Sequence, residues 1–276
     1  MSDCSNWWVV HSDFARSLVY KFRTTHPSCD ADLEALFNFV GGYIVVHEVY
    51  AHTAWNATAS TSYKGQVTDM CDDANLQTLT GCSTDFLQLL ADVNALAADF
   101  TTCSKLDYVD PELLTSLEHR RHDLERRLHD GARSDRLDDP NAEVSESQLT
   151  IELKRLTGLL HLYSRLDHLG PRDPTISQLS TRILSLIARL PVRSNIILWP
   201  LFMVATLGVG LGCDSDRAFI LSKLDQLQRT RQMRYIKKAR DITLEVWKVR
   251  DLKETGIGMG WDILDQTSRM ERISLF

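Results

Sequence analysis

The sequence predicts an all-α protein, one multi-helix domain that covers residues 1–276. Apolar residues recur at three- and four-residue spacing along most of the chain, whereas the alternation typical of strands is scarce. Hydrophobic residues make up 43% of the 276 positions, which is enough for a substantial core. No internal repeat is evident. We therefore expect a single helical domain with a long mid-chain loop at about 129–147.

Capping residues and proline indicate where the helices begin. Asp30 or Asp32 lies near the cap of the second expected helix, and Ser83 or Thr84 starts the third. Pro111 suits the first turn of the fourth helix. The expected helices cover about 8–23, 32–55, 84–100, 111–131, 148–169, 175–190, 195–210, 216–231, 234–250 and 261–273. Between them, 56–80 and 129–147 are polar and are expected to be loops.

The segment Ile196–Cys213 contains no charged residue and is long enough to be compared with a membrane span. Pro200 near its start, three glycines near its end and the lack of a second span favour a buried central helix instead. Within about twenty positions it is followed by a dense basic run, which consists of Arg229, Arg231, Arg234, Lys237, Lys238 and Arg240. An apolar wall beside clustered cations suits a ligand with an apolar tail and an anionic head, although charge runs more often mark solvated faces.

Bulk charge and cysteine usage narrow the functional classes. The net charge of −6 argues against a nucleic-acid binder driven by overall charge. The six cysteines form no Cys-x-x-Cys pair, and the first residues lack the pattern of a signal peptide. We expect a cytoplasmic protein with reduced thiols, no transmembrane segment and no nucleic-acid partner, and a homodimer is one possible assembly.

Several segments, in order, resemble the regulatory domain of fungal zinc-cluster transcription factors. These are Trp8-x-x-His11, Gly81-Cys82-Ser83, Trp199-Pro200-Leu201-Phe202, Ala239-Arg240-Asp241-Ile242 and Trp261. The resemblance spans nearly the whole chain and implies that family's all-helical fold. The family's DNA-reading module, a six-cysteine zinc cluster, has no counterpart in this sequence. One functional hypothesis is therefore a non-catalytic regulatory or ligand-sensing domain that lacks its DNA-binding module.

A second resemblance is carried by Met233-x-x-x-Lys237, which places an apolar side chain and an ammonium one helical turn apart. This pair is similar to one in the fungal humulene synthases of tropolone sesquiterpenoid pathways. That resemblance implies a Mg²⁺-dependent cyclase that ionises farnesyl diphosphate and closes an eleven-membered ring to give humulene. In that role Lys237 grips the diphosphate as the catalytic cation, and Met233 shapes the wall around the substrate.

The cyclase is our leading hypothesis, and the regulatory domain is the alternative. The chemistry of the cyclase reaction suggests which other residues would take part. Mg²⁺ prefers carboxylate oxygens, and the candidate metal ligands are Glu48, Asp241 and Glu245. The candidate substrate-binding residues, besides Met233 and Lys237, are Arg234, Trp199 and Phe202. Each has a structural alternative. Glu48 could pair with His52, Lys237 could pair with Asp241 on a solvated stripe, and the aromatic residues could be core.

Overall fold

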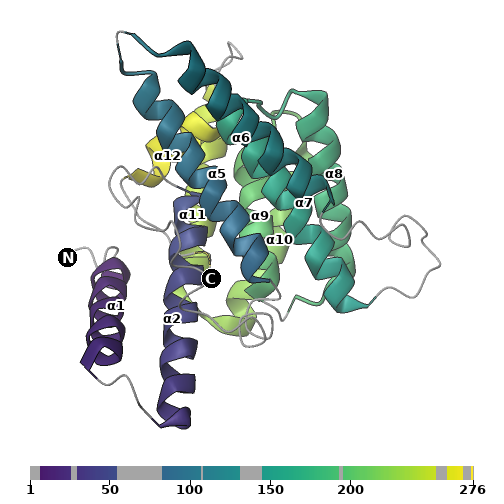
Figure 1. Ribbon diagram of the computed structural model, residues 1–276. Helices are drawn as coiled ribbons and strands as arrows, with labels where there is room; N and C mark the ends of the chain where they lie inside the picture. Colours follow the sequence, from purple (N-terminus) through teal and green to yellow (C-terminus); the bar gives the residue numbers. More distant parts are fainter. Residues whose placement is uncertain are drawn as a thin grey trace.

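The computed structural model describes residues 7–25, 30–54, 83–106, 108–130, 145–192, 195–252, 260–269 and 275. Every regular element in these ranges is helical, which confirms the predicted all-α class (Figure 1). The elements are, in order, α1 (Trp7–Thr25), α2 (Ala31–His52), α5 (Thr84–Cys103), α6 (Pro111–Asp130), α7 (Glu146–Leu166), α8 (Pro174–Arg189), the 3-10 turn η3 (Asn195–Ile197), α9 (Leu198–Met203), the π-helix η4 (Val204–Gly208), α10 (Asp214–Arg231), α11 (Arg234–Leu252) and α12 (Gly260–Arg269).

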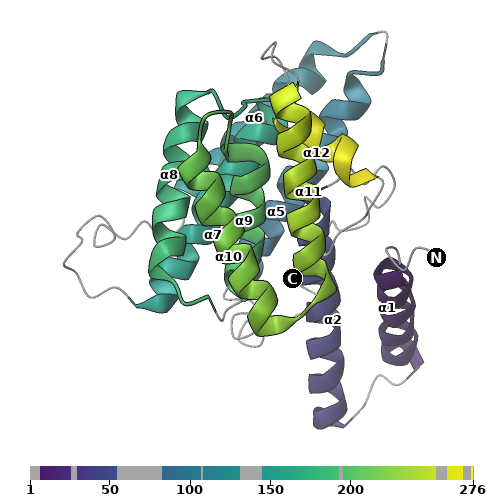
Figure 2. The ribbon, with the colours of Figure 1, turned by 180° about the vertical axis from the view of Figure 1, so that it is seen from behind.

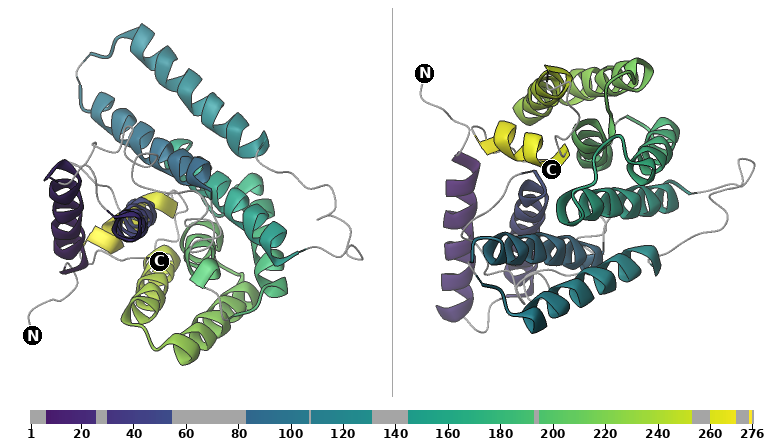
Figure 3. Two further views of the ribbon diagram at one scale, coloured as in Figure 1. Left: turned by 60° about the horizontal axis from the view of Figure 1, so that its bottom comes forward. Right: turned by 90° about the horizontal axis from the view of Figure 1, so that it is seen from above.

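The centre of the fold is the uncharged segment that the sequence predicts to be buried. Residues 197–209 are all buried, and they form α9 and the π-helix η4. Helices α7, α8, α11 and α12 all pack against this segment, which lies inside a ring of helices (Figure 3). No helix within the described ranges is long and apolar enough to cross a membrane. The prediction of a buried central element is confirmed, although the element is shorter and less regular than one helix over 195–210.

Helix α7 lies beside this centre and is buried on nearly every side. It contacts α5, α6, α8, α9 and α12. Its N-terminus is fixed by a capping box, in which the Ser145 hydroxyl accepts from the Gln148 N–H at 3.2 Å and the Gln148 side chain accepts from the Ser145 N–H. The N-termini of two neighbouring helices are also capped, that of α5 by Ser83 and that of α8 by Asp173. Local capping therefore sets where the core helices begin.

Helices α1 and α2 form a hairpin that stands beside the rest of the molecule (Figures 1 and 2). The C-terminal half of α2 is buried and packs against α5, whereas its first ten residues are exposed or half-buried. Helix α1 makes its main contact with α2, through a stack of Phe22 on Phe37 with ring centroids 4.4 Å apart. The lower part of this hairpin, in the view of Figure 1, therefore extends beyond the main body.

Most expected helices match the observed ones to within a few residues, and 148–169 begins at Glu146 and ends at Leu166. The expected loop at 56–80, all but the ends of the loop at 129–147 and residues 270–273 of the last expected helix lie outside the described residues.

Candidate functional site

The five predicted site residues at the start and middle of α11 all lie on its solvent side. The set consists of Met233, Arg234, Lys237, Asp241 and Glu245, and every side chain in it is exposed. Met233 directly precedes the helix, and its carbonyl accepts from the Ile236 N–H at 3.2 Å. The residues that α11 buries are Ile236, Ala239, Ile242, Thr243, Val246 and Trp247. Helical periodicity thus directs the apolar residues toward the core and the predicted cation and carboxylates toward solvent.

The charged side chains of α11 form ion pairs at the protein surface. Glu245 lies 3.2 Å from Lys248, one turn further along the helix. Across the described ranges, neither Lys237 nor Asp241 takes part in a salt bridge, so the pair between them considered above is not formed there. The neighbouring Arg240 contacts Asp225 of α10 at 3.2 Å, which ties the basic run to the preceding helix.

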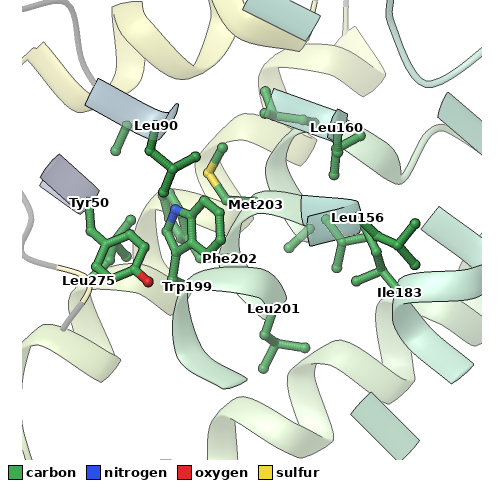
Figure 4. Close-up of a cluster of buried hydrophobic side chains, with 14 of the residues drawn as sticks. Tyr50, Leu90, Leu156, Leu160, Ile183, Trp199, Leu201, Phe202, Met203 and Leu275 are labelled. Atoms are coloured by element: carbon green, nitrogen blue, oxygen red, sulfur yellow. The ribbon is translucent and has the colours of Figure 1, made fainter. Parts of the chain in front are cut away.

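Trp199 and Phe202 lie in the core rather than at the surface (Figure 4). The Trp199 indole N–H donates to the Thr53 hydroxyl at 2.8 Å, and its ring lies 4.8 Å from that of Tyr50. Helix α9, which carries both residues, meets the apolar side of α11. The aromatic residues and Lys237 are therefore on opposite sides of the same helix, and the structure does not bring them together.

Glu48 lies in the buried half of α2 and forms an ion pair with Arg16 of α1. Because an unpaired buried carboxylate is costly, this pair accounts for an acid within an apolar helix. Asp241 and Glu245 lie on the exposed face of α11 instead. In the part of the chain that the structure describes, no three His, Cys, Asp or Glu side chains are grouped so that they could hold a metal ion.

Sequence reasoning missed the charged residues buried along α7. Glu152 and Arg155 are both buried, and the Arg155 guanidinium donates to the Glu152 carboxylate at 2.6 and 2.8 Å. Arg182 of α8 reaches the same carboxylate at 3.1 Å, and Arg155 also donates to the Leu128 carbonyl of α6 at 3.1 Å. This network joins three helices through one carboxylate.

A second buried group, at the C-terminal end of α7, surrounds Arg165. Its guanidinium lies 4.0 Å from the centroid of the Trp261 ring and donates to the His52 carbonyl at 3.3 Å. Burial lowers the pKa of Arg165 to about 9, an effect that the charge of Asp265 opposes. The guanidinium therefore stays charged at neutral pH and ties α12 to α2 and α7. We call this set the Arg165 cluster, which consists of Asn94, His161, Ser164, Arg165, Trp261 and Asp265.

His161 is the histidine of the Arg165 cluster. It is fully buried, and its Nε2 lies 3.0 Å from the Asn94 side-chain oxygen. Burial, reinforced by the positive charge of Arg165, holds the pKa of His161 well below its ordinary value, so the ring is neutral at pH 7. Its Nδ1 and the Ser164 hydroxyl are buried and have no hydrogen-bond partner among the residues described. The His161-x-x-x-Arg165 spacing is the one sequence signal that could have pointed to this cluster.

A third set of buried polar groups supports the π-helix. The Arg250 guanidinium donates to the Val209 carbonyl at 2.6 Å and to the Thr206 carbonyl, and the Trp247 indole donates to the Ala205 carbonyl at 2.7 Å. A π-turn disturbs the regular helical hydrogen bonds, so its carbonyls need other donors. Two side chains of α11 supply them, which explains how an irregular turn is stable in the core.

Comparison with known proteins shows which family has this sequence pattern. A family model for the fungal specific transcription factor domain matches the chain over residues 1–276. A search of curated proteins and a search of solved structures find no match. The family match agrees with the resemblance to zinc-cluster regulatory domains, and nothing in the comparisons points to a humulene synthase. The chain belongs to the fungal specific transcription factor domain family.

Proposed function

We propose that this chain acts as a non-catalytic regulatory domain of a fungal transcription factor. The observation that carries the proposal is the family match, which extends over the whole sequence. The domain would affect transcription through contacts with other proteins, because the sequence contains no six-cysteine zinc cluster to read DNA bases.

The surroundings of the buried charged groups also support a structural rather than catalytic role for them. Arg155 is paired with Glu152, Arg165 is held by Trp261 and a backbone carbonyl, and Arg250 serves the π-helix. Each of these arginines joins separate helices. A catalytic cation stabilises charge that develops on the substrate, whereas these three arginines contact side chains and carbonyls of the protein itself.

A reporter experiment tests the regulatory proposal. The full chain is fused to a heterologous DNA-binding domain and expressed in a filamentous fungal host, with a reporter behind the cognate operator. We expect reporter transcript to differ from that obtained with the DNA-binding domain alone. An Arg250→Met fusion, weakened in its core, should lose the difference. A folded fusion that occupies the operator and leaves transcript unchanged would overturn the proposal.

The sesquiterpene cyclase remains the second hypothesis. What supports it is the exposure of Met233, directly before α11, and of Lys237 in the first turn of that helix. The test is incubation of folded protein with farnesyl diphosphate and Mg²⁺, followed by gas chromatography of hydrocarbons. Humulene above a boiled control, lost in Lys237→Ala and altered in isomer ratio in Met233→Leu, would favour the cyclase over the non-catalytic proposal. The absence of hydrocarbon would eliminate it.

A further inference from the structure

The α1–α2 hairpin exposes large apolar side chains in a helical pattern. On α1, Phe14 and Leu18 are 63% and 49% exposed. On α2, Leu36, Phe39 and Tyr43 are 54%, 43% and 46% exposed. Single exposed apolar residues are ordinary on protein surfaces, but a contiguous group of them marks an interaction site. The question is whether these five form one surface.

Helix geometry places all of them on one side of the hairpin. The exposed stripe of each helix recurs at three- and four-residue spacing and lies somewhat more than a third of a turn from the face that contacts the other helix. In both helices, rotation about the helix axis in the direction in which the chain winds leads from the exposed stripe to the contact face. Because the helices are antiparallel, equal rotation brings both stripes to the same side. We call this surface the hairpin face, and it consists of Phe14, Leu18, Lys21, Asp32, Leu36, Phe39 and Tyr43.

The inner side of the hairpin fixes this orientation. Phe22 stacks on Phe37 with centroids 4.4 Å apart, and Arg16 pairs with Glu48. Val19 of α1, between these two contacts, is only 2% exposed. These residues hold α1 against α2 in one rotation, so the hairpin face is a fixed surface of the folded chain rather than a consequence of a loose helix.

The hairpin face is large enough for a specific contact. Each aromatic side chain carries about 150–250 Å² of surface, so the exposed fractions correspond to roughly 500 Å² of apolar area per chain. Two such faces in contact would bury about 1,000 Å², which is the lower end of specific protein interfaces. Contact of this size predicts reversible, concentration-dependent association.

The charges on the hairpin face indicate what covers it. The stripe on α1 ends in a cation, Lys21, and the stripe on α2 begins with an anion, Asp32; both are exposed. Both lie toward the end of the hairpin where the two helices are joined. A surface that carries both signs, one on each helix, is complementary to itself after a two-fold rotation, which is the property that a symmetric interface requires.

We propose that the hairpin face binds the same face of a second copy of this chain, in a two-fold dimer in which α1 of each copy lies against α2 of the other. The four helices then form an antiparallel bundle with the apolar stripes inside. In this arrangement Lys21 of each copy faces the helix that carries Asp32. Contact of α1 with α1 would instead reverse the direction of the second hairpin, and Lys21 would lie at the far end of the dimer from the Asp32 of the other copy.

Sedimentation velocity of the full chain, from micromolar to near-millimolar concentration, tests the dimer. We expect a concentration-dependent shift from monomer to dimer. Phe39→Glu should raise the dissociation constant at least about tenfold, whereas Tyr108→Glu, at a 79% exposed aromatic outside the face, should not change it. Leu36→Gln serves as a second variant if Phe39→Glu unfolds. A protein that stays monomeric throughout, or a dimer equally sensitive to Tyr108→Glu, would overturn the proposal.

A mixing experiment tests the relative arrangement. Lys21→Glu and Asp32→Lys should each weaken the dimer, because each homodimer then opposes like charges across α1 and α2. An equimolar mixture should restore wild-type affinity, because both contacts in the mixed dimer regain opposite signs. If α1 met α1, positions 21 and 32 of the two copies would lie at opposite ends of the dimer, so each single variant and the mixture would all bind like the wild type. That pattern would contradict the arrangement proposed here.

Discussion

Gly208, the last residue of the π-helix, gives a test of core packing in which two physical effects predict opposite signs. The residue is buried where η4 packs against α8. A Cβ at this position would overlap the Ser180 hydroxyl of α8 and would lie 3.1 Å from both the Ser180 Cβ and a Val204 methyl. Backbone entropy alone predicts that Gly208→Ala stabilises the protein by about 0.5–1 kcal/mol. Packing predicts destabilisation.

We expect the packing cost to exceed the entropic gain, because the atoms around Gly208 cannot all move away from an added methyl group. The Ser180 hydroxyl can rotate away only by giving up its 2.7 Å bond to the Ile176 carbonyl, and the Ser180 Cβ is fixed by the backbone of α8. Inserting a methyl group into a packed core costs about 1–3 kcal/mol. We therefore expect Gly208→Ala to lower the free energy of unfolding by about 1–2 kcal/mol after the entropic gain is offset.

Urea denaturation, with the midpoint compared at constant slope, measures this change. Ser180→Ala removes the most crowded atom, so the double variant should recover part of the loss, while Ser180→Ala alone should be within about 0.5 kcal/mol of the wild type. Gly158→Ala in α7 is the matched control, since its closest neighbour is a flexible Leu128 methyl at 3.1 Å. The packing argument fails if Gly208→Ala equals or exceeds the wild type in stability.

Two further predictions concern buried polar groups. Because the folded-state pKa of His161 is depressed, its contribution to stability is intact above the unfolded value near 6.5 and is lost as pH falls below it, by up to about 1.4 kcal/mol per pH unit. His161→Gln keeps an amide near Asn94 but cannot titrate, so its stability should vary less with pH between 6.5 and about 5; identical profiles would rule out this assignment. Arg250→Met leaves the Thr206 and Val209 carbonyls without their donor and should cost about 2–4 kcal/mol in urea denaturation. A near-native midpoint would mean that these carbonyls find other partners.

Periodicity and capping predict most of the fold because both act over one or two helical turns. Ser83 and Pro111 mark helix starts whatever surrounds them, and the apolar stripes give the faces that pack. The π-helix at Val204–Gly208 could not be predicted in the same way. Its carbonyls depend on Arg250 and Trp247, more than 40 positions further along the chain. No local pattern contains that information.

The buried charges of α7 show a second limit. A segment with Glu152, Lys154 and Arg155 is typical of a solvated helix face, yet all three side chains are buried. They are tolerated because Glu152 is shared between Arg155 and Arg182, and because the Lys154 ammonium lies 5.7 Å from the Tyr50 ring centroid. Arg155 lies in the same helix as Glu152, but Arg182 and Tyr50 come from other helices, so the burial depends on tertiary structure and does not follow from the segment alone.

For the candidate site, the sequence held more information than the two-residue match used. The spacing of Ile236, Ala239 and Ile242 already assigns the buried side of α11, and Lys237 with Asp241 falls on the other side. The same periodicity that suggested a one-turn pair could thus have shown that the pair faces away from the aromatic residues of α9. A short motif needs the rest of its helix before it is assigned to a site.

Helix α2 connects the protein core with the hairpin face. Its C-terminal half belongs to the core, where Tyr50 meets Trp199 and the His52 carbonyl accepts from Arg165. Its N-terminal half carries Leu36 and Phe39 of the hairpin face. Because those two side chains lie at the surface while Gly208 is in the core, their substitutions should act on different equilibria. Hairpin-face variants should change association at an unchanged monomer stability, and core variants should change stability at an unchanged affinity between folded chains.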